Sequence, residues 1–145
     1  MGRTVSLADA FETRCGFVEA YTDLQSKKAQ DAVAKATTVL VVTGSQSTEG
    51  ADRATLALDG EAMIEAAAKL NNHIIVACAA PGAFLTGWRD SVQAILTTWP
   101  GGQELANALV DVLFGDVNPS ARLPLTLPMT ANDLKFTQRM YPGLV

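Results

Sequence analysis

One polar stretch, residues 43–58, holds the side chains of this sequence whose types and spacing could do chemistry. It reads TGSQSTEGADRATLAL and follows four consecutive apolar residues, 39–42, that are typical of a buried strand. Within it Glu49 precedes a glycine, and Asp52 and Arg53 follow three and four residues later. A carboxyl group presented on a turn can give and take protons as a general acid and base.

Three interpretations of this stretch are open from the residues alone. It could be a solvent-exposed connector, although such connections usually take about 2–6 residues. It could bind phosphate, as the Ser-, Thr- and Gly-rich flavin-mononucleotide loop of flavodoxins does. That kind of loop runs directly into a helix N-terminus, whereas residues 51–58 intervene here, and the sequence contains no G-x-x-x-x-G-K-[ST] motif. The third interpretation is that Glu49 is an acid/base residue facing away from its own domain.

The other polar candidates favour structural roles. Asp52 and Arg53 are expected to hold the loop by an ion pair rather than to touch a substrate. Glu104 falls at a predicted helix start, where a carboxylate interacts favourably with the helix dipole or caps the helix. His73 stands at the head of a predicted strand and no Ser or Cys partner is suggested, so it is expected to be structural.

Strand-like and helix-like segments alternate along the chain, which indicates βαβ units. The predicted central strands of a mainly parallel sheet are residues 39–42, 74–77 and 94–96. The predicted helices are residues 6–14, 25–36 and 103–114, and a further one that carries Met63, Ile64, Ala67 and Leu70 on one face. Residues 17–22 and 122–127 are predicted edge strands, the second because Pro124 lacks an N–H. The expected fold class is therefore α/β: a flavodoxin-like three-layer αβα sandwich with helices on both faces and an antiparallel edge strand.

Composition limits the classes of partner. A chain of 145 residues with 48% hydrophobic content is expected to form one domain, residues 1–145. A net charge of −4 and a pI near 4.8 argue against a nucleic acid or an anionic membrane as partner. No apolar run approaches the roughly 20 residues of a membrane span, and residues 1–21 lack the apolar core of a secretory signal. Cys15 and Cys78 form no C-x-x-C, so both are expected to be buried thiols, and no metal or cofactor is expected.

Two motifs carry a resemblance to a known family. Residues 111–120 read DVLFGDVNPS and are followed by RLP at 122–124, while residues 49–53 read EGADR. The first run is similar, position by position, to the helix end and turn of the C-terminal α/β sandwich domain of glycoside hydrolase family 3, which contains β-glucosidases and β-xylosidases. The second is similar to the E-G-x-D-R of that domain, and the resemblance covers roughly residues 6–141. The departures are an additional glycine in PGGQE, LA where G-G is common after it, and Ala121 where glycine is usual.

The resemblance implies a function shared between two domains. Retaining glycosidases need two carboxyl groups about 5–5.5 Å apart, one as nucleophile and one as acid/base. Glu49 matches the acid/base position of many family members, whereas the nucleophilic aspartate belongs to a preceding TIM barrel that does not fit in 145 residues. The chain is thus expected to be inactive alone. It is expected to act with that barrel on a β-glucoside or oligosaccharide, hydrolysing terminal β-linked glucosyl or xylosyl residues.

Two points stay open at this stage. Trp88 and Trp99, at predicted strand or turn ends, could line a sugar-binding cleft, but core packing is at least as well supported. The alternative function is a non-catalytic module, either a flavodoxin-like binder or a domain that acts only by association.

Overall fold

The computed structural model describes residues 4–133 and residue 135 of the chain. Its elements, in chain order, are α1 (Leu7–Cys15), α2 (Lys27–Lys35), β1 (Val39–Gly44), α3 (Glu61–Ala68), β2 (Ile74–Ala79), the 3-10 helix η1 (Arg89–Ser91), β3 (Ala94–Thr98) and α4 (Leu105–Leu113). None of the helices in this described part is long and apolar enough to cross a membrane.

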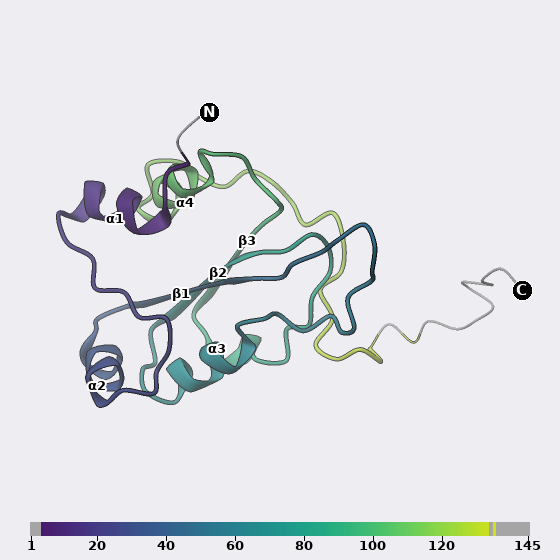
Figure 1. Ribbon diagram of the computed structural model, residues 1–145, viewed down its shortest axis with the longest axis horizontal. Coiled ribbons are helices and arrows are strands. Elements are labelled where there is room, and N and C mark those ends of the chain that lie inside the picture. Colours follow the sequence, from purple (N-terminus) through teal and green to yellow (C-terminus); the bar gives the residue numbers. More distant parts are fainter. Residues whose placement is uncertain (1–3, 134, 136–145) are drawn as a thin grey trace, which may run out of the picture.

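The three strands form one parallel sheet in the order β1-β2-β3. Figure 1 shows α1 and α4 on one face of the sheet and α2 and α3 on the other. The predicted three-layer α/β sandwich is therefore confirmed, and the three predicted strands lie where the apolar runs placed them. Because the strands are parallel, all three lead into their loops at the same edge of the sheet.

Local capping signals explain where the helices begin and end. The hydroxyl groups of Ser6 and Ser26 accept hydrogen bonds from backbone N–H groups three residues later, both at 3.1 Å, which satisfies free donors in the first turns of α1 and α2. Gly16 and Gly115 follow α1 and α4 with φ of 74° and 79°, a left-handed conformation that glycine adopts without steric cost.

The main hydrophobic core lies on the α2 and α3 face of the sheet. Ile64 of α3, Ile74 and Val76 of β2, and Phe84 from the β2–η1 connection are fully buried. A much smaller cluster, centred on Ala10, Ala106 and Val110, lies between α1 and α4. The loop after β1 contributes Leu58 to the main core, so one end of that loop is part of the folded body.

The two predicted edge strands are not formed in the described part of the chain. Residues 17–22 and 122–127 are irregular, so in the sheet formed by the described residues β1 and β3 are the edges and β2 is central. A strand needs a continuous backbone partner, and neither segment pairs with the sheet. Pro124 has no N–H to donate, and most of residues 122–127 are exposed.

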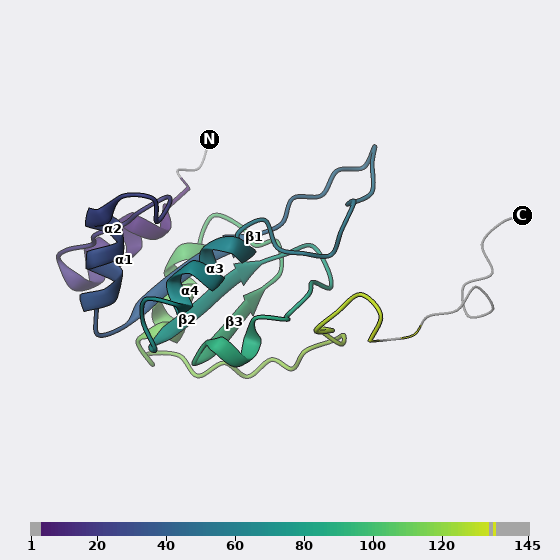
Figure 2. The same cartoon turned by 90° about the horizontal axis from the view of Figure 1, so that it is seen from below.

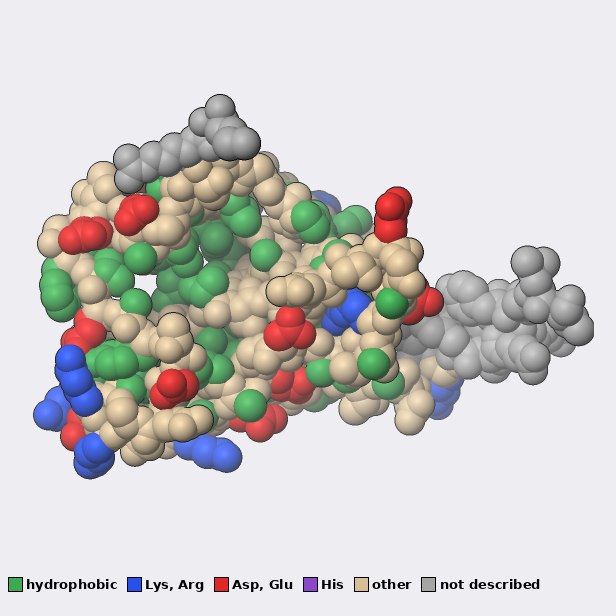
Figure 3. All heavy atoms as spheres, in the orientation of Figure 1, with side chains coloured by type: hydrophobic (Ala, Val, Ile, Leu, Met, Phe, Trp, Pro, Cys, Tyr) green, Lys and Arg blue, Asp and Glu red, His purple; other side chains and the backbone are tan. Residues whose placement is uncertain are grey.

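An apolar hollow of about 760 Å³ lies along the outer edge of β1. Its lining includes Phe11 of α1, Phe17, Val33 of α2, Val42 of β1 and Met63 of α3. Figure 3 shows hydrophobic side chains gathered in this hollowed part of the surface. Residues 17–22 form its outer wall rather than a strand of the sheet.

Candidate functional site

The β1–α3 loop, residues 45–60, projects beyond the sheet at the edge where the strands end (Figures 1 and 2). Its two ends are close together, because the N–H of Asp59 donates to the carbonyl of Gly44 at 3.0 Å. A Cβ on Gly44 would collide with the carbonyl oxygen of Ala79 in the neighbouring strand. Glycine at this position lets the loop leave β1 in close contact with β2.

The base of the loop, Ser45 and residues 53–60, is tied to the body of the domain. The Ser45 N–H donates to the carbonyl of Ala79 at 3.1 Å, and the Leu85 N–H donates to the carbonyl of Leu56 at 3.0 Å. Leu58 is 3% exposed and packs in the main core. The base thus has both backbone hydrogen bonds and a buried anchor.

Arg53 adds a second set of contacts to the base. Its Nη2 donates to Ser45 Oγ at 3.2 Å and to the carbonyl of Ala57 at 3.1 Å, while Nη1 donates to the carbonyl of Ala83 at 3.4 Å. Among the described residues it forms no ion pair with Asp52. The prediction that Arg53 holds the loop is confirmed, but the predicted ion pair is wrong, because the acceptors are neutral oxygens.

The tip of the loop, residues 46–52, is exposed throughout. Thr48 and Ala51 form an isolated antiparallel bridge, and the Thr48 hydroxyl donates to the Ala51 carbonyl at 3.3 Å. Glu49 and Gly50 make the turn between them. The tip is thus a short hairpin whose hydrogen bonds are internal.

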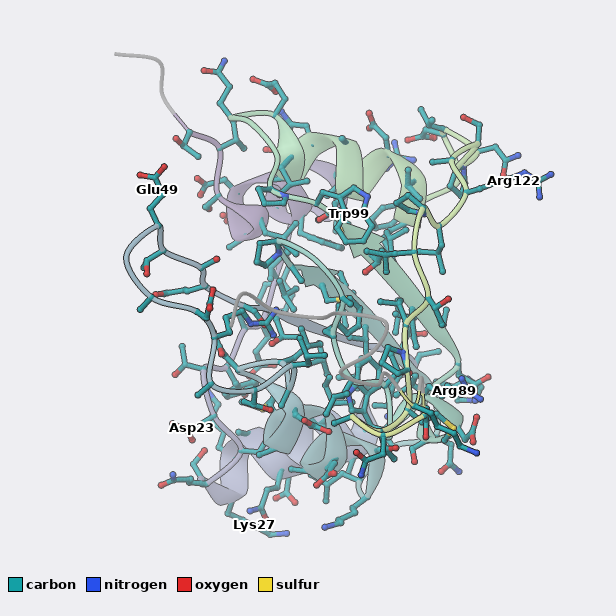
Figure 4. The ribbon with its side chains drawn as sticks, turned by 90° about the vertical axis from the view of Figure 1, so that its right-hand side faces the viewer. Asp23, Lys27, Glu49, Arg89, Trp99 and Arg122 are labelled. Atoms are coloured by element: carbon teal, nitrogen blue, oxygen red, sulfur yellow. The ribbon has the colours of Figure 1, made fainter. Side chains whose placement is uncertain are left out.

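Glu49 lies at the end of this hairpin, and its side chain points away from the rest of the molecule (Figure 4). Its carboxylate has no hydrogen-bond or ion-pair partner within the described residues. The structure therefore places this carboxyl group where it can meet another molecule or domain. No hydrogen bond joins it to a second carboxyl group in residues 4–133.

The loops after β2 and β3 lie at the same edge of the sheet. Trp99 follows β3 directly and is half-buried. Trp88 is 3% exposed and belongs to the main core, and the hollow of about 300 Å³ that it helps to line lies beside α3 and η1 rather than at the β1–α3 loop. The indole N–H of Trp88 is buried and has no hydrogen-bond partner among the residues that the structure describes. Of the two tryptophans, only Trp99 has exposed surface that a ligand could contact.

Glu104 and His73 have structural surroundings. Glu104 directly precedes α4, as predicted, but its carboxylate accepts from the side-chain amides of Asn107 at 2.7 Å and Gln103 at 3.3 Å instead of capping the helix. The backbone of His73 takes part in the sheet, its carbonyl accepting from the Val39 N–H at 2.9 Å. Within the part of the chain that the structure describes, the hydrogen bonds of Glu104 go to neighbouring amides and those of His73 are made by its backbone.

The two cysteines differ in their surroundings. Cys78 is buried in β2, as predicted, and this burial raises the pKa of its thiol although a hydrogen-bond contact with Thr97 Oγ1 acts in the opposite direction. Cys15 is exposed at the end of α1, so its predicted burial is wrong. The described residues contain no group of three or more His, Cys, Asp or Glu placed to hold a metal ion.

The lining of the hollow beside β1 is poor in catalytic groups. Tyr21 and Glu19 are its ionisable members. They hydrogen-bond to each other, and this bond raises the pKa of the Tyr21 hydroxyl. A catalytic site needs polar groups that converge on a substrate, and these two satisfy each other instead.

Comparison with known proteins gives consistent matches. The model of the "Glycosyl hydrolase family 3 C-terminal domain" matches residues 3–143. A β-glucosidase of Rhizobium radiobacter is 37% identical over 138 residues, which are 90% of this chain and 17% of that protein. A probable β-glucosidase J of Aspergillus fumigatus is 36% identical over 112 residues, which are 74% of this chain and 13% of that protein.

The fold matches solved structures as well. A glycoside hydrolase family 3 β-glucosidase from Neurospora crassa superimposes with a TM-score of 0.80 at 30% sequence identity. This match covers 87% of the present chain and 17% of the Neurospora chain. The chain therefore corresponds to a small part of each of these relatives.

Proposed function

This chain belongs to the C-terminal domains of glycosyl hydrolase family 3, and we propose that it supplies the general acid/base of a retaining β-glycosidase from the tip of the β1–α3 loop. The substrate class is a terminal β-linked glucosyl or xylosyl residue of a glucoside or oligosaccharide. The proposal rests on one observation: Glu49 is exposed, without a partner among the described residues, at the end of a loop whose base is anchored.

The chemistry is divided between two carboxyl groups. A carboxylate from a second domain attacks the anomeric carbon, while Glu49 protonates the leaving oxygen. In the second step Glu49 takes a proton from water, which then hydrolyses the glycosyl-enzyme intermediate. Each carboxyl group must lie on its own side of the scissile bond, so Glu49 must be presented at a distance from its own domain. A projecting loop does this.

The partner in this proposal is a TIM-barrel domain of the same enzyme. A general acid must hold its proton near neutral pH, and burial together with a neighbouring anion provides this. The tip of the loop is exposed in this chain, so burial has to come from the second domain. That domain also contributes the nucleophile, which is why the isolated chain is expected to show no hydrolysis.

The test is Glu49→Gln in the full-length enzyme that contains this chain. We expect hydrolysis of an alkyl β-glucoside or a disaccharide to fall by about 10²–10⁴-fold, the typical contribution of general acid–base catalysis. The glycosylation step of an aryl glucoside with an activated leaving group should change far less, because that group departs without protonation. Steady-state kcat and KM for both substrates, with pre-steady-state bursts, measure this difference.

Glu65→Gln is the matched control. It makes the same chemical change at an exposed position of α3, away from the loop, and should leave both rates unchanged. Full activity of Glu49→Gln toward the alkyl glucoside would remove Glu49 from the mechanism. Turnover of a β-glucoside by this chain alone would contradict the two-domain proposal. Only the first of these two results would favour the non-catalytic module.

A further inference from the structure

Arg53 occupies the neck of the β1–α3 loop. The exposed tip comprises residues 46–52, so Ser45 is the last residue before it and Arg53 the first residue after it. The 3.2 Å hydrogen bond from Arg53 Nη2 to Ser45 Oγ joins these two flanking residues directly. The tip that carries Glu49 is therefore closed at its neck by one side-chain contact.

The same guanidinium also joins the neck to the body of the domain. Nη2 donates to the carbonyl of Ala57, in the returning segment of the loop, and Nη1 donates to the carbonyl of Ala83, in the β2–η1 connection. The three acceptors thus come from three separate backbone segments. A guanidinium presents its donors in a rigid planar fork, so it fixes the directions of these segments as well as their separation.

The remaining contacts of the tip are internal and do not set its direction. The Thr48–Ala51 bridge shapes the hairpin itself, and residues 46–52 are all exposed. Backbone hydrogen bonds hold Ser45, Leu56 and Asp59 at the base. Arg53 is the side chain that connects the neck of the tip to this base and to the β2–η1 connection. Only a few residues separate Arg53 from Glu49 in the chain.

We propose that Arg53 is a positioning residue for Glu49, acting by locking the neck of the loop so that the carboxyl group is presented in one direction. The inference rests on the proposed function of Glu49 as acid/base. A displacement of about 1 Å in a catalytic group can cost about 10²-fold in rate. Loss of the Arg53 fork should therefore impair the protonation step and leave substrate binding largely intact.

The experiment compares Arg53→Met with Arg53→Lys in the full-length enzyme. Methionine keeps much of the aliphatic length without a donor, and lysine keeps the charge without the fork. We expect Arg53→Met to lower kcat for an alkyl β-glucoside by about 10²-fold with little change in KM. The glycosylation rate for an activated aryl glucoside should fall far less, and lysine should restore only part of the loss. Arg122→Met, at an exposed arginine on another part of the surface (Figure 4), is the matched control and should behave as wild type.

A double variant shows whether Arg53 acts through Glu49. Residues that work as one unit have non-additive effects, so Arg53→Met should cause no further loss on the alkyl glucoside in a Glu49→Gln background. Ser45→Ala removes only the neck acceptor and should give a smaller loss with the same leaving-group dependence. This variant also keeps the test decisive if Arg53→Met does not fold.

The outcomes separate this inference from the function on which it rests. If Glu49→Gln shows no leaving-group dependence, the proposed function fails and the role of Arg53 fails with it. If Glu49→Gln shows that dependence but Arg53→Met and Ser45→Ala slow all leaving groups equally, only the positioning role is overturned. The same conclusion follows if the losses from Arg53→Met and Glu49→Gln simply multiply.

Discussion

The base and the tip of the β1–α3 loop are consecutive in sequence but are held in opposite ways. The base has a buried leucine, backbone hydrogen bonds to the body of the domain and the Arg53 fork. Within the described part of the chain, the tip is held by an internal bridge alone, and all of its residues are exposed. The loop therefore combines a well-anchored support with an end that contributes little to the stability of its own domain.

This difference indicates how stability and function are divided along the loop. Substitutions in the base should change the free energy of unfolding, whereas substitutions in the tip should leave it unchanged and affect only the activity of the assembled enzyme.

The largest effect is expected at the buried leucine of the base. Leu58 is 3% exposed, so Leu58→Ala should lower the free energy of unfolding by about 2–5 kcal/mol through lost burial and the cavity left behind. Leu56, two residues earlier, is 40% exposed, so Leu56→Ala should lower the free energy of unfolding much less. Urea unfolding followed by tryptophan fluorescence measures both. Equal losses at the two positions would show that the base is not anchored through Leu58.

A smaller effect is expected at the glycine from which the loop leaves β1. Gly44→Ala would place a Cβ against the carbonyl oxygen of Ala79, and such overpacking costs about 1–3 kcal/mol. Gly50 in the tip is the matched glycine, because a Cβ added there would meet no heavy atom within 4 Å, so Gly50→Ala should be nearly neutral. The same urea titration compares them. A neutral Gly44→Ala would mean that β1 and β2 can separate at this edge without loss of stability.

The smallest effect on stability is expected at the residue with the largest proposed effect on activity. Glu49→Ala should change the free energy of unfolding by no more than about 0.5 kcal/mol, because an exposed side chain that points away from the molecule loses no contact. Thermal unfolding of the wild type and the variant measures this difference. A loss above about 1 kcal/mol would show that the tip is held by its own domain, contrary to the contrast between base and tip.

Secondary structure was largely predictable because its signals are local. The serines before α1 and α2 and the glycines after α1 and α4 act on backbone groups within a few residues. The apolar runs likewise marked all three strands. The predicted edge strands failed because pairing depends on a distant partner, and neither residues 17–22 nor residues 122–127 pair with the sheet.

The candidate site was predictable only in part, for the same reason. Glu49 could be identified from its neighbours in EGADR and from the length of the stretch that contains it. The ion pair between Asp52 and Arg53 was the expected interaction because oppositely charged neighbours are visible in a sequence. The actual acceptors of Arg53 include the carbonyl of Ala83, which is distant in the chain, and a backbone carbonyl has no signature in sequence.

The sequence by itself therefore determined the alternation of strands and helices, the approximate positions of the helices, the long polar loop and the carboxyl group within it. The tertiary structure alone decided that β1 is an edge strand, that Trp88 is buried while Cys15 is exposed, and that the loop has an anchored base and a free tip. The first set depends on interactions between residues close together in the chain. The second depends on which distant backbone and side-chain groups meet when the sheet forms, and that is decided by packing in three dimensions.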